Sequence, residues 1–128
     1  MKIHALIIAA IGAGIAAPLI IAAPANAATA GDTVIYTWCS DVPDNSTSTW
    51  YDADNDIAQF ENTHLPTYFA ADGRFCGHQT VVSASTYQLT ASSLQTDGLY
   101  SACTIRVNGE LVASNAATGR YAISECAA

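Results

Sequence analysis

The segment that decides the fold runs from Tyr100 to Ser114 and reads YSACTIRVNGELVAS. Two β-prone runs flank Asn108-Gly109, a pair that tolerates the positive φ angles of a type I′ turn. A two-residue loop here pairs Val107 with Glu110, Ile105 with Val112 and Cys103 with Ser114. Because side chains alternate along a strand, one face of the hairpin carries Cys103, Ile105, Val107 and Val112. The segment predicts a hairpin whose apolar face, including the Cys103 sulfur, turns into a core.

Short strands separated by polar turns are predicted on both sides of this hairpin. Thr33 to Cys39 carries apolar side chains on both faces, as a well-buried strand does. Further strands are predicted at 46–51 and 57–65, which form a second hairpin, and at 79–83, 87–91 and 120–124, with a polar connection over 92–98 and an irregular segment over 66–77. About seven strands without repeats or predicted helices indicate a single all-β domain, a β-sandwich, over residues 28–128.

Residues 1–27 have the composition of a secretory signal peptide. A weakly basic start is followed by an uncharged apolar stretch from Ile3 to Ala23, and Ala25-Asn26-Ala27 supplies small residues for signal peptidase. We expect a signal helix that is cleaved before Ala28, which leaves no membrane span in the mature chain. The alternative is a retained membrane anchor, because an apolar stretch of roughly 20 residues is long enough to cross a bilayer.

The mature part is strongly acidic. It holds all eleven Asp and Glu residues but only three basic residues, Arg74, Arg106 and Arg120, so its net charge is 3 minus 11, or −8. Nucleic acids and anionic lipid surfaces bind proteins largely through clustered Lys and Arg. The charge therefore argues against both classes of partner, nucleic acid above all, and the acidity is typical of a protein that stays soluble outside the cell.

Four cysteines in this part indicate disulfides, provided that the chain is exported to an oxidising compartment. They are Cys39, Cys76, Cys103 and Cys126, and three pairings are possible. Consecutive pairing would close two loops of moderate length, each worth roughly 3 to 4 kcal/mol in the chain-entropy account.

Asp52, Asp54 and Asp56 have the one-three-five spacing that begins a calcium-binding loop. Ile57 stands where that loop needs Gly, and Thr63 stands where it needs a bidentate Glu. A hairpin turn explains the same residues, because Asp and Asn are common turn formers. The sequence leaves a weak calcium site as a candidate and implies no other metal and no cofactor.

No catalytic pattern is present. The chain has no Gly-x-Ser-x-Gly elbow, and no two of its Cys or His residues, His64 and His78 included, have the spacing of a zinc motif. Cys76 and His78 could form a nucleophile pair, but a disulfide is the stronger expectation outside the cell. We therefore expect a protein that is not an enzyme.

Two other features concern the surface. Asn45-Ser46-Thr47 matches the glycosylation acceptor pattern and suggests an exposed loop. Trp38, Trp50 and Tyr51 could line a ligand groove, although packing between two sheets is the commoner fate of strand aromatics.

Several of these segments resemble the extracytoplasmic domain of the mycobacterial small membrane proteins, the MmpS family. The resemblance is carried by WYDADNDIAQ from Trp50 to Gln59, by Leu65-Pro66, by ACTIRVNGELV from Ala102 to Val112 and by the closing Cys126. It implies an immunoglobulin-like sandwich in which Cys103 pairs with Cys126, and it leaves Cys39 and Cys76 as an additional bridge. Thr67 departs from the family, which has an aromatic residue after Leu-Pro, and so does the cleavable leader.

The resemblance also implies a function. Members of the family are accessory partners of transporters that export lipids and siderophores, and they have no catalytic residues. We expect a secreted or cell-envelope protein of an actinobacterium that binds an envelope transport protein or a lipid-like ligand. The alternative is a freely secreted carrier or inhibitor module with an extracellular target.

Overall fold

The structure is a computed structural model that describes residues 28–128, and the predicted leader lies outside the described residues. Nine strands make up this part: β1 Thr33–Ser40, β2 Asp44–Tyr51, β3 Ile57–His64, β4 Thr67–Phe69, β5 Arg74–Val82, β6 Ala91–Gln95, β7 Tyr100–Val107, β8 Glu110–Thr118 and β9 Ile123–Ala127. Within residues 28–128 no helix is long and apolar enough to span a bilayer.

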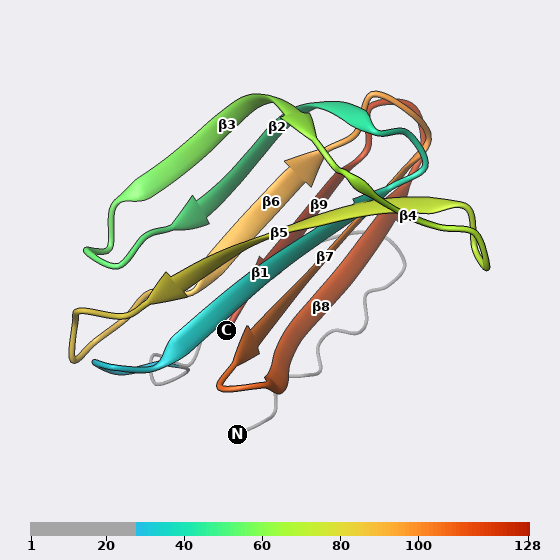
Figure 1. The fold of residues 1–128 in the computed structure, drawn as a ribbon. Helices are drawn as coiled ribbons and strands as arrows, with labels where there is room; N and C mark the ends of the chain where they lie inside the picture. The colour runs from blue at the N-terminus through green and yellow to red at the C-terminus, as the bar shows by residue number, and fades with distance from the viewer. Residues whose placement is uncertain (1–27) are drawn as a thin grey trace.

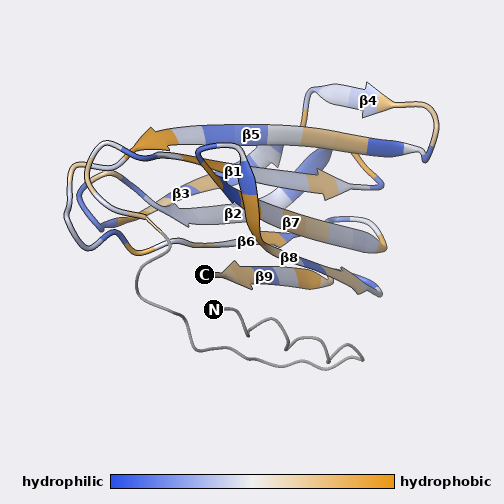
Figure 2. Ribbon diagram, turned by 90° about the horizontal axis from the view of Figure 1, so that it is seen from below, coloured by the Kyte–Doolittle hydropathy of each residue, from blue (hydrophilic) through white to orange (hydrophobic). Residues whose placement is uncertain are grey.

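The strands form two antiparallel sheets that lie face to face, as Figure 2 shows. One sheet has the order β4-β5-β1-β7-β8 and the other β3-β2-β6-β9 (Figure 1). The prediction of an all-β sandwich is confirmed. The structure has nine strands where about seven were expected: β4 was not predicted, and β6 lies later in the chain than the strand predicted at 87–91.

The strand order matches that of an immunoglobulin fold. Those domains arrange one sheet as A-B-E-D and the other as G-F-C, with C′ added beside C in the variable type. Here β4-β5-β1 takes the places of D, E and B, and β3-β2-β6-β9 takes those of C′, C, F and G. The β7–β8 hairpin lies between F and G in the chain and occupies the position of A beside β1.

The core lies between the sheets and is centred on β1. Val34, Tyr36 and Trp38 point inward from alternate positions of this strand and are at most 2% exposed. They meet Leu94 from β6 and Ile105 from β7, both fully buried. The outward positions of β1 are only partly buried, so the predicted burial of both faces holds for one face.

Hydroxyl groups take up much of the remaining space between the sheets. The Oγ of Ser101 donates to the Leu94 carbonyl at 2.7 Å and lies 2.7 Å from the Ser124 Oγ. A second buried pair joins the Ser40 Oγ to the Thr96 Oγ1 at 2.8 Å. Such pairs remove the cost of burying the hydroxyls, and they let strands poor in large apolar residues enter the core.

This polar packing explains the wrong strand predictions near β6. The sequence predicted a strand at 87–91 and a polar connection at 92–98, whereas the strand is β6, Ala91–Gln95. Ser92 and Leu94 face inward from it and are buried. Likewise, β5 begins at Arg74 inside the segment predicted to be irregular, and the last strand begins at Ile123 instead of near 120.

The two predicted hairpins are present. Asn108 and Gly109 have φ angles of 51° and 87°, as a type I′ turn requires, and Val107 pairs with Glu110. A β-bulge between Ile105 and Arg106 then shifts the register. Ile105 pairs with Ala113 and Cys103 with Asn115, so those two predicted pairings are wrong by one residue. Cys103, Ile105 and Val107 nevertheless face the core, as predicted.

The two long sides of the sandwich differ. On the side that we name the closed side, β7 and β8 both contact β9 of the opposite sheet. We name the other side the open side. There one sheet ends at β3, and in the other sheet the short strand β4 pairs with the outer edge of β5 only at Arg74–Cys76. The chain crosses between the sheets on the open side at Leu65-Pro66, which links β3 to β4.

Candidate functional site

Two neighbouring hollows lie on the open side, and both are open to solvent. The first has a volume of about 250 Å³ and is lined by Trp38, Phe60, Thr63, His64, Leu65, Pro66, Thr67, Gly77 and His78. The second has a volume of about 290 Å³ and is lined by Thr37, Cys39, Thr67, Phe69, Cys76, Gly77 and His78. We name the first the inter-sheet hollow and the second the outer hollow. The two hollows share Thr67, Gly77 and His78. They therefore adjoin each other at β5, beside the Leu65-Pro66 segment.

Gly77 makes this crossing possible. A Cβ atom added at Gly77 would lie 3.2 Å from both the Leu65 Cδ2 and the Pro66 Cδ, which is tighter than ordinary van der Waals contact. Leu65 is 1% exposed, and its N–H donates to the Pro43 carbonyl at 2.7 Å. The missing side chain of Gly77 therefore lets the crossing segment pack closely against the sheet beside the hollows.

A row of aromatic rings runs from the core to the inter-sheet hollow. The ring centroids of Trp38 and Trp50 are 5.7 Å apart, and those of Trp50 and Phe60 are 4.8 Å apart. Trp38 and Trp50 are buried, whereas Phe60 is 49% exposed. Trp38 and Phe60 give this hollow an apolar wall, and Trp50 packs against both rings.

The hollow also has polar groups at its rim. The His64 Nδ1 lies 2.7 Å from the Asp44 Oδ1, and both side chains are largely exposed. The Trp38 Nε1 is buried and has no hydrogen-bond partner among residues 28–128. Leaving such a donor unpaired costs about 1 to 3 kcal/mol.

The predicted aromatic groove is only partly matched. Trp38 lines the inter-sheet hollow, but Trp50 packs in the core behind Phe60, and Tyr51 lines neither hollow. The Tyr51 carbonyl accepts a hydrogen bond from the buried Tyr36 hydroxyl at 3.0 Å, and burial raises the pKa of that phenol. Trp50 and Tyr51 thus belong to the packing of the sandwich.

The acidic run forms a turn. The Asp52 Oδ1 accepts hydrogen bonds from the N–H groups of Asp54 and Asp56 at 2.9 and 3.0 Å. Asn55 adopts a positive φ of 64°, and its side chain reaches the backbone of Tyr87 and Leu89. Among residues 28–128 no three His, Cys, Asp or Glu side chains are grouped to hold a metal ion. The weak calcium candidate at Asp52, Asp54 and Asp56 is therefore not supported.

The glycosylation pattern does not mark an exposed residue. Asn45 is 1% exposed, its Nδ2 donates to the Val42 carbonyl, and its Oδ1 accepts from the Asp97 N–H. The expectation of an exposed loop there is wrong, because the side chain amide holds two loops together inside the fold. A glycan on Asn45 would not fit the folded domain.

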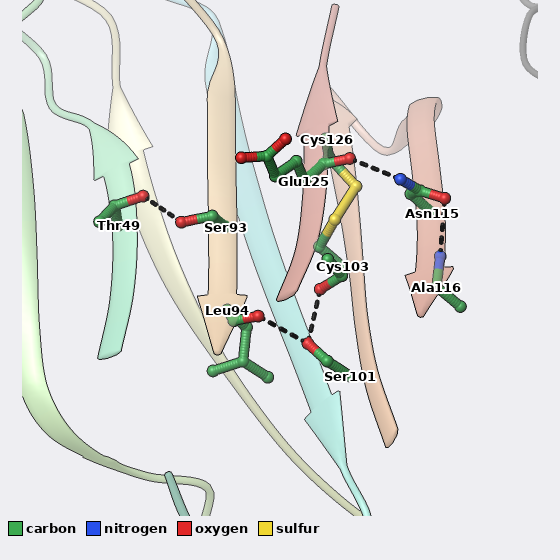
Figure 3. The surroundings of a disulfide bond; sticks show 10 residues. Thr49, Ser93, Leu94, Ser101, Cys103, Asn115, Ala116, Glu125 and Cys126 are labelled. Atoms are coloured by element: carbon green, nitrogen blue, oxygen red, sulfur yellow. Dashed lines mark hydrogen bonds between the residues drawn. A yellow bond between two sulfur atoms is a disulfide. The ribbon is translucent and has the colours of Figure 1, made fainter. Parts of the chain in front are cut away.

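Both expected disulfides are present. Cys39 joins Cys76 within one sheet, and Cys103 joins Cys126 across the two sheets. The bridge engages Cys76, so the pairing of this residue with His78 as a nucleophile is excluded in the oxidised protein. Figure 3 shows the bridge between β7 and β9, with Asn115 of β8 beside it; the Asn115 Nδ2 donates to the Glu125 carbonyl at 3.0 Å.

Sequence reasoning missed the other residues of the open side. Phe60 and Gly77 lie on different strands, and only the fold brings them to one hollow with the Leu65-Pro66 crossing. The Leu-Pro dipeptide was noticed, yet it carried no sign of what it would pack against. Comparison with protein-family models gives no match, and no curated protein matches the chain.

Proposed function

We propose that this chain is a non-enzymatic, exported binding protein that holds an apolar group of its partner in the inter-sheet hollow. The observation that carries this proposal is the aromatic row that ends at Phe60, on a side where the two sheets are not joined strand to strand. Ligand sites in proteins are typically apolar concavities with a few polar groups that fix orientation.

The charges support an uncharged or amphipathic ligand. The mature chain has a net charge of −8, yet none of the nine residues that line the hollow is Asp, Glu, Lys or Arg. His64, His78 and the threonines supply polar contacts near the apolar wall. A lipid-like molecule, or an apolar segment of an envelope protein, fits this distribution.

The resemblance to the MmpS family supports an accessory role beside an envelope transporter in an actinobacterium. The proposal includes export, with a leader over 1–27, because disulfides form and persist mainly in oxidising compartments outside the cytosol. An accessory would remain with membranes after cell fractionation. The second candidate, a freely secreted carrier or inhibitor, would appear in the medium, and the same exposed hollow would serve it.

The test uses anilinonaphthalene sulfonate, an amphipathic fluorescent probe with apolar rings and one sulfonate group, with the exported protein and two matched variants. Phe60 and Leu111 are 49% and 47% exposed, but only Phe60 lines the hollow. We expect Phe60→Ser to weaken probe binding about tenfold, since half-burying an aromatic ring is worth roughly 1.4 kcal/mol. Leu111→Ser should leave binding unchanged. Equal effects of the two variants, or probe contacts mapped away from Gly77 and His78, would contradict the proposed site.

A further inference from the structure

The two disulfides differ in what surrounds them. Cys103 and Cys126 are 1% and 5% exposed and lie between the sheets. Cys39 and Cys76 are only partly buried, and both line the outer hollow. A thiolate must reach a sulfur along the S–S axis to exchange with it, so access to the bridge limits the rate of the reaction.

The Cys39–Cys76 bridge lies within one sheet, so the sheet can stay paired when the bridge opens. Cys39 and Cys76 are direct cross-strand partners in the pairing of β1 with β5. Eight residue pairs hold these two strands together, and seven more pairs hold β1 to β7. Opening the Cys39–Cys76 bridge therefore leaves both strands in the sheet, whereas opening the other bridge removes a covalent link between the sheets.

From this geometry we infer that Cys39–Cys76 is a thiol–disulfide exchange site, open to a dithiol reductant in the folded protein. A thiolate of the dithiol attacks one sulfur of the bridge, forms a mixed disulfide and releases the other cysteine as a thiolate, which takes up a proton. The second thiol of the dithiol, having lost its proton, then displaces the remaining cysteine. Two electrons and two protons pass to the chain, and the dithiol becomes a disulfide.

A reductant can reach the Cys39–Cys76 bridge through the outer hollow. Thr37, Thr67, Phe69 and His78 surround the bridge there, and none of them carries a carboxylate that would repel an incoming thiolate. Beyond Cys76, residues 77–82 of β5 have no strand on their outer side within the described part of the chain. An extended segment of a dithiol protein would find unpaired backbone groups next to the sulfur that it attacks.

The test treats the oxidised, exported protein with dithiothreitol, traps free thiols by alkylation at intervals and identifies them by peptide mass. We expect Cys39 and Cys76 to be labelled at least about tenfold faster than Cys103 and Cys126. Circular dichroism should keep its β-sheet signal throughout the first phase. Labelling of all four cysteines at one rate, or loss of the signal with the first pair, would overturn the inference.

Two matched variants test the route of attack. Thr37 and Thr104 are cross-strand partners and are both partly buried, but only Thr37 lines the outer hollow. Thr37→Phe should slow the labelling of Cys39 and Cys76 severalfold by narrowing the hollow, while Thr104→Phe should not. Equal rates in both variants would show that the hollow is not the path to the bridge.

Discussion

The closed side and the open side of the sandwich join the two sheets by different means. On the closed side β9 contacts both β7 and β8, the Cys103–Cys126 bridge lies buried between them, and Asn115 adds a hydrogen bond to the Glu125 carbonyl. On the open side the Leu65-Pro66 segment crosses between the sheets, and two hollows lie beside it. We therefore expect the closed side to contribute more to stability, while the open side carries the accessible groups.

The largest expected effect comes from removing the disulfides in turn. The two loops span 37 and 23 residues, so loop-closure entropy favours the Cys39–Cys76 bridge by only about 0.4 kcal/mol. Replacing Cys103 and Cys126 by Ala also empties buried space, which adds about 1 to 2 kcal/mol. We expect a loss near 5 kcal/mol for this pair and about 4 kcal/mol for Cys39 and Cys76, as measured by urea denaturation.

The order of these two losses tests the comparison directly. A larger loss for the Cys39 and Cys76 double variant would mean that loop length outweighs burial. The closed side would then not be the more stabilising one. Single serine variants are a poorer choice, because they leave an unpaired thiol that can form new bridges.

A smaller effect is expected at Gly77, on the open side. Gly77→Ala places a methyl group 3.2 Å from two carbon atoms of the Leu65-Pro66 crossing, which must shift by a few tenths of an ångström. Crowding of this kind costs about 1 to 2 kcal/mol. We also expect weaker binding of the fluorescent probe, since Gly77, Leu65 and Pro66 all line the inter-sheet hollow.

The glycine of the turn at Gly73 provides a contrast. A Cβ atom there would meet nothing within 4 Å, so Gly73→Ala acts only through its positive φ of 69°. It should cost stability without changing probe binding. If Gly77→Ala also left binding unchanged, the crossing segment would not shape the hollow.

The two sides also differ in how far the sequence predicts them. The β7–β8 hairpin was predictable because an Asn-Gly turn is a local signal that needs no distant contact. The bulge after Ile105 was not, because nothing in the alternation of residues marks an extra one. Strand β6 was missed because its inward Ser92 and the neighbouring Ser101 and Ser124 are polar by composition, although the fold buries them.

The candidate site was almost wholly beyond sequence reasoning. Phe60, Leu65 and Gly77 are close only because β3 and β5 end at the same side of the sandwich. Of the three aromatic residues that the sequence singled out, Trp38 lines the hollow, whereas Trp50 and Tyr51 belong to the packing of the sandwich. Side chain type distinguishes a binding residue from a core residue poorly, since both are apolar, and exposure is set by the strand order.

The smallest expected effect concerns Asp32, which ties the start of β1 to the β7–β8 turn near the closed side. Its Oδ1 accepts from the Asn108 Nδ2 at 3.0 Å, and its Oδ2 accepts from the Thr29 N–H at 2.9 Å. These two hydrogen bonds, that of Asn108 first, lower the pKa of Asp32 below its ordinary value of 3.8. A lowered folded-state pKa means that the carboxylate stabilises the fold above the unfolded pKa. The contribution is lost as the pH falls through the folded value.

Asp32→Asn should therefore lower the urea midpoint slightly near neutral pH. The difference from wild type should shrink as the pH falls through the folded-state pKa of Asp32, because the wild-type carboxyl is then protonated in both states. The carboxylate lies at the surface, so added salt should shrink the difference at neutral pH. Asp72→Asn is the matched control, because the Asp72 carboxylate accepts no hydrogen bond among residues 28–128. If the midpoint shift for Asp32→Asn stayed constant with pH, the substitution would act through the geometry of the turn and not through the charge of the carboxylate. The contribution of the Asp32–Asn108 hydrogen bond to stability would then not depend on ionisation of Asp32.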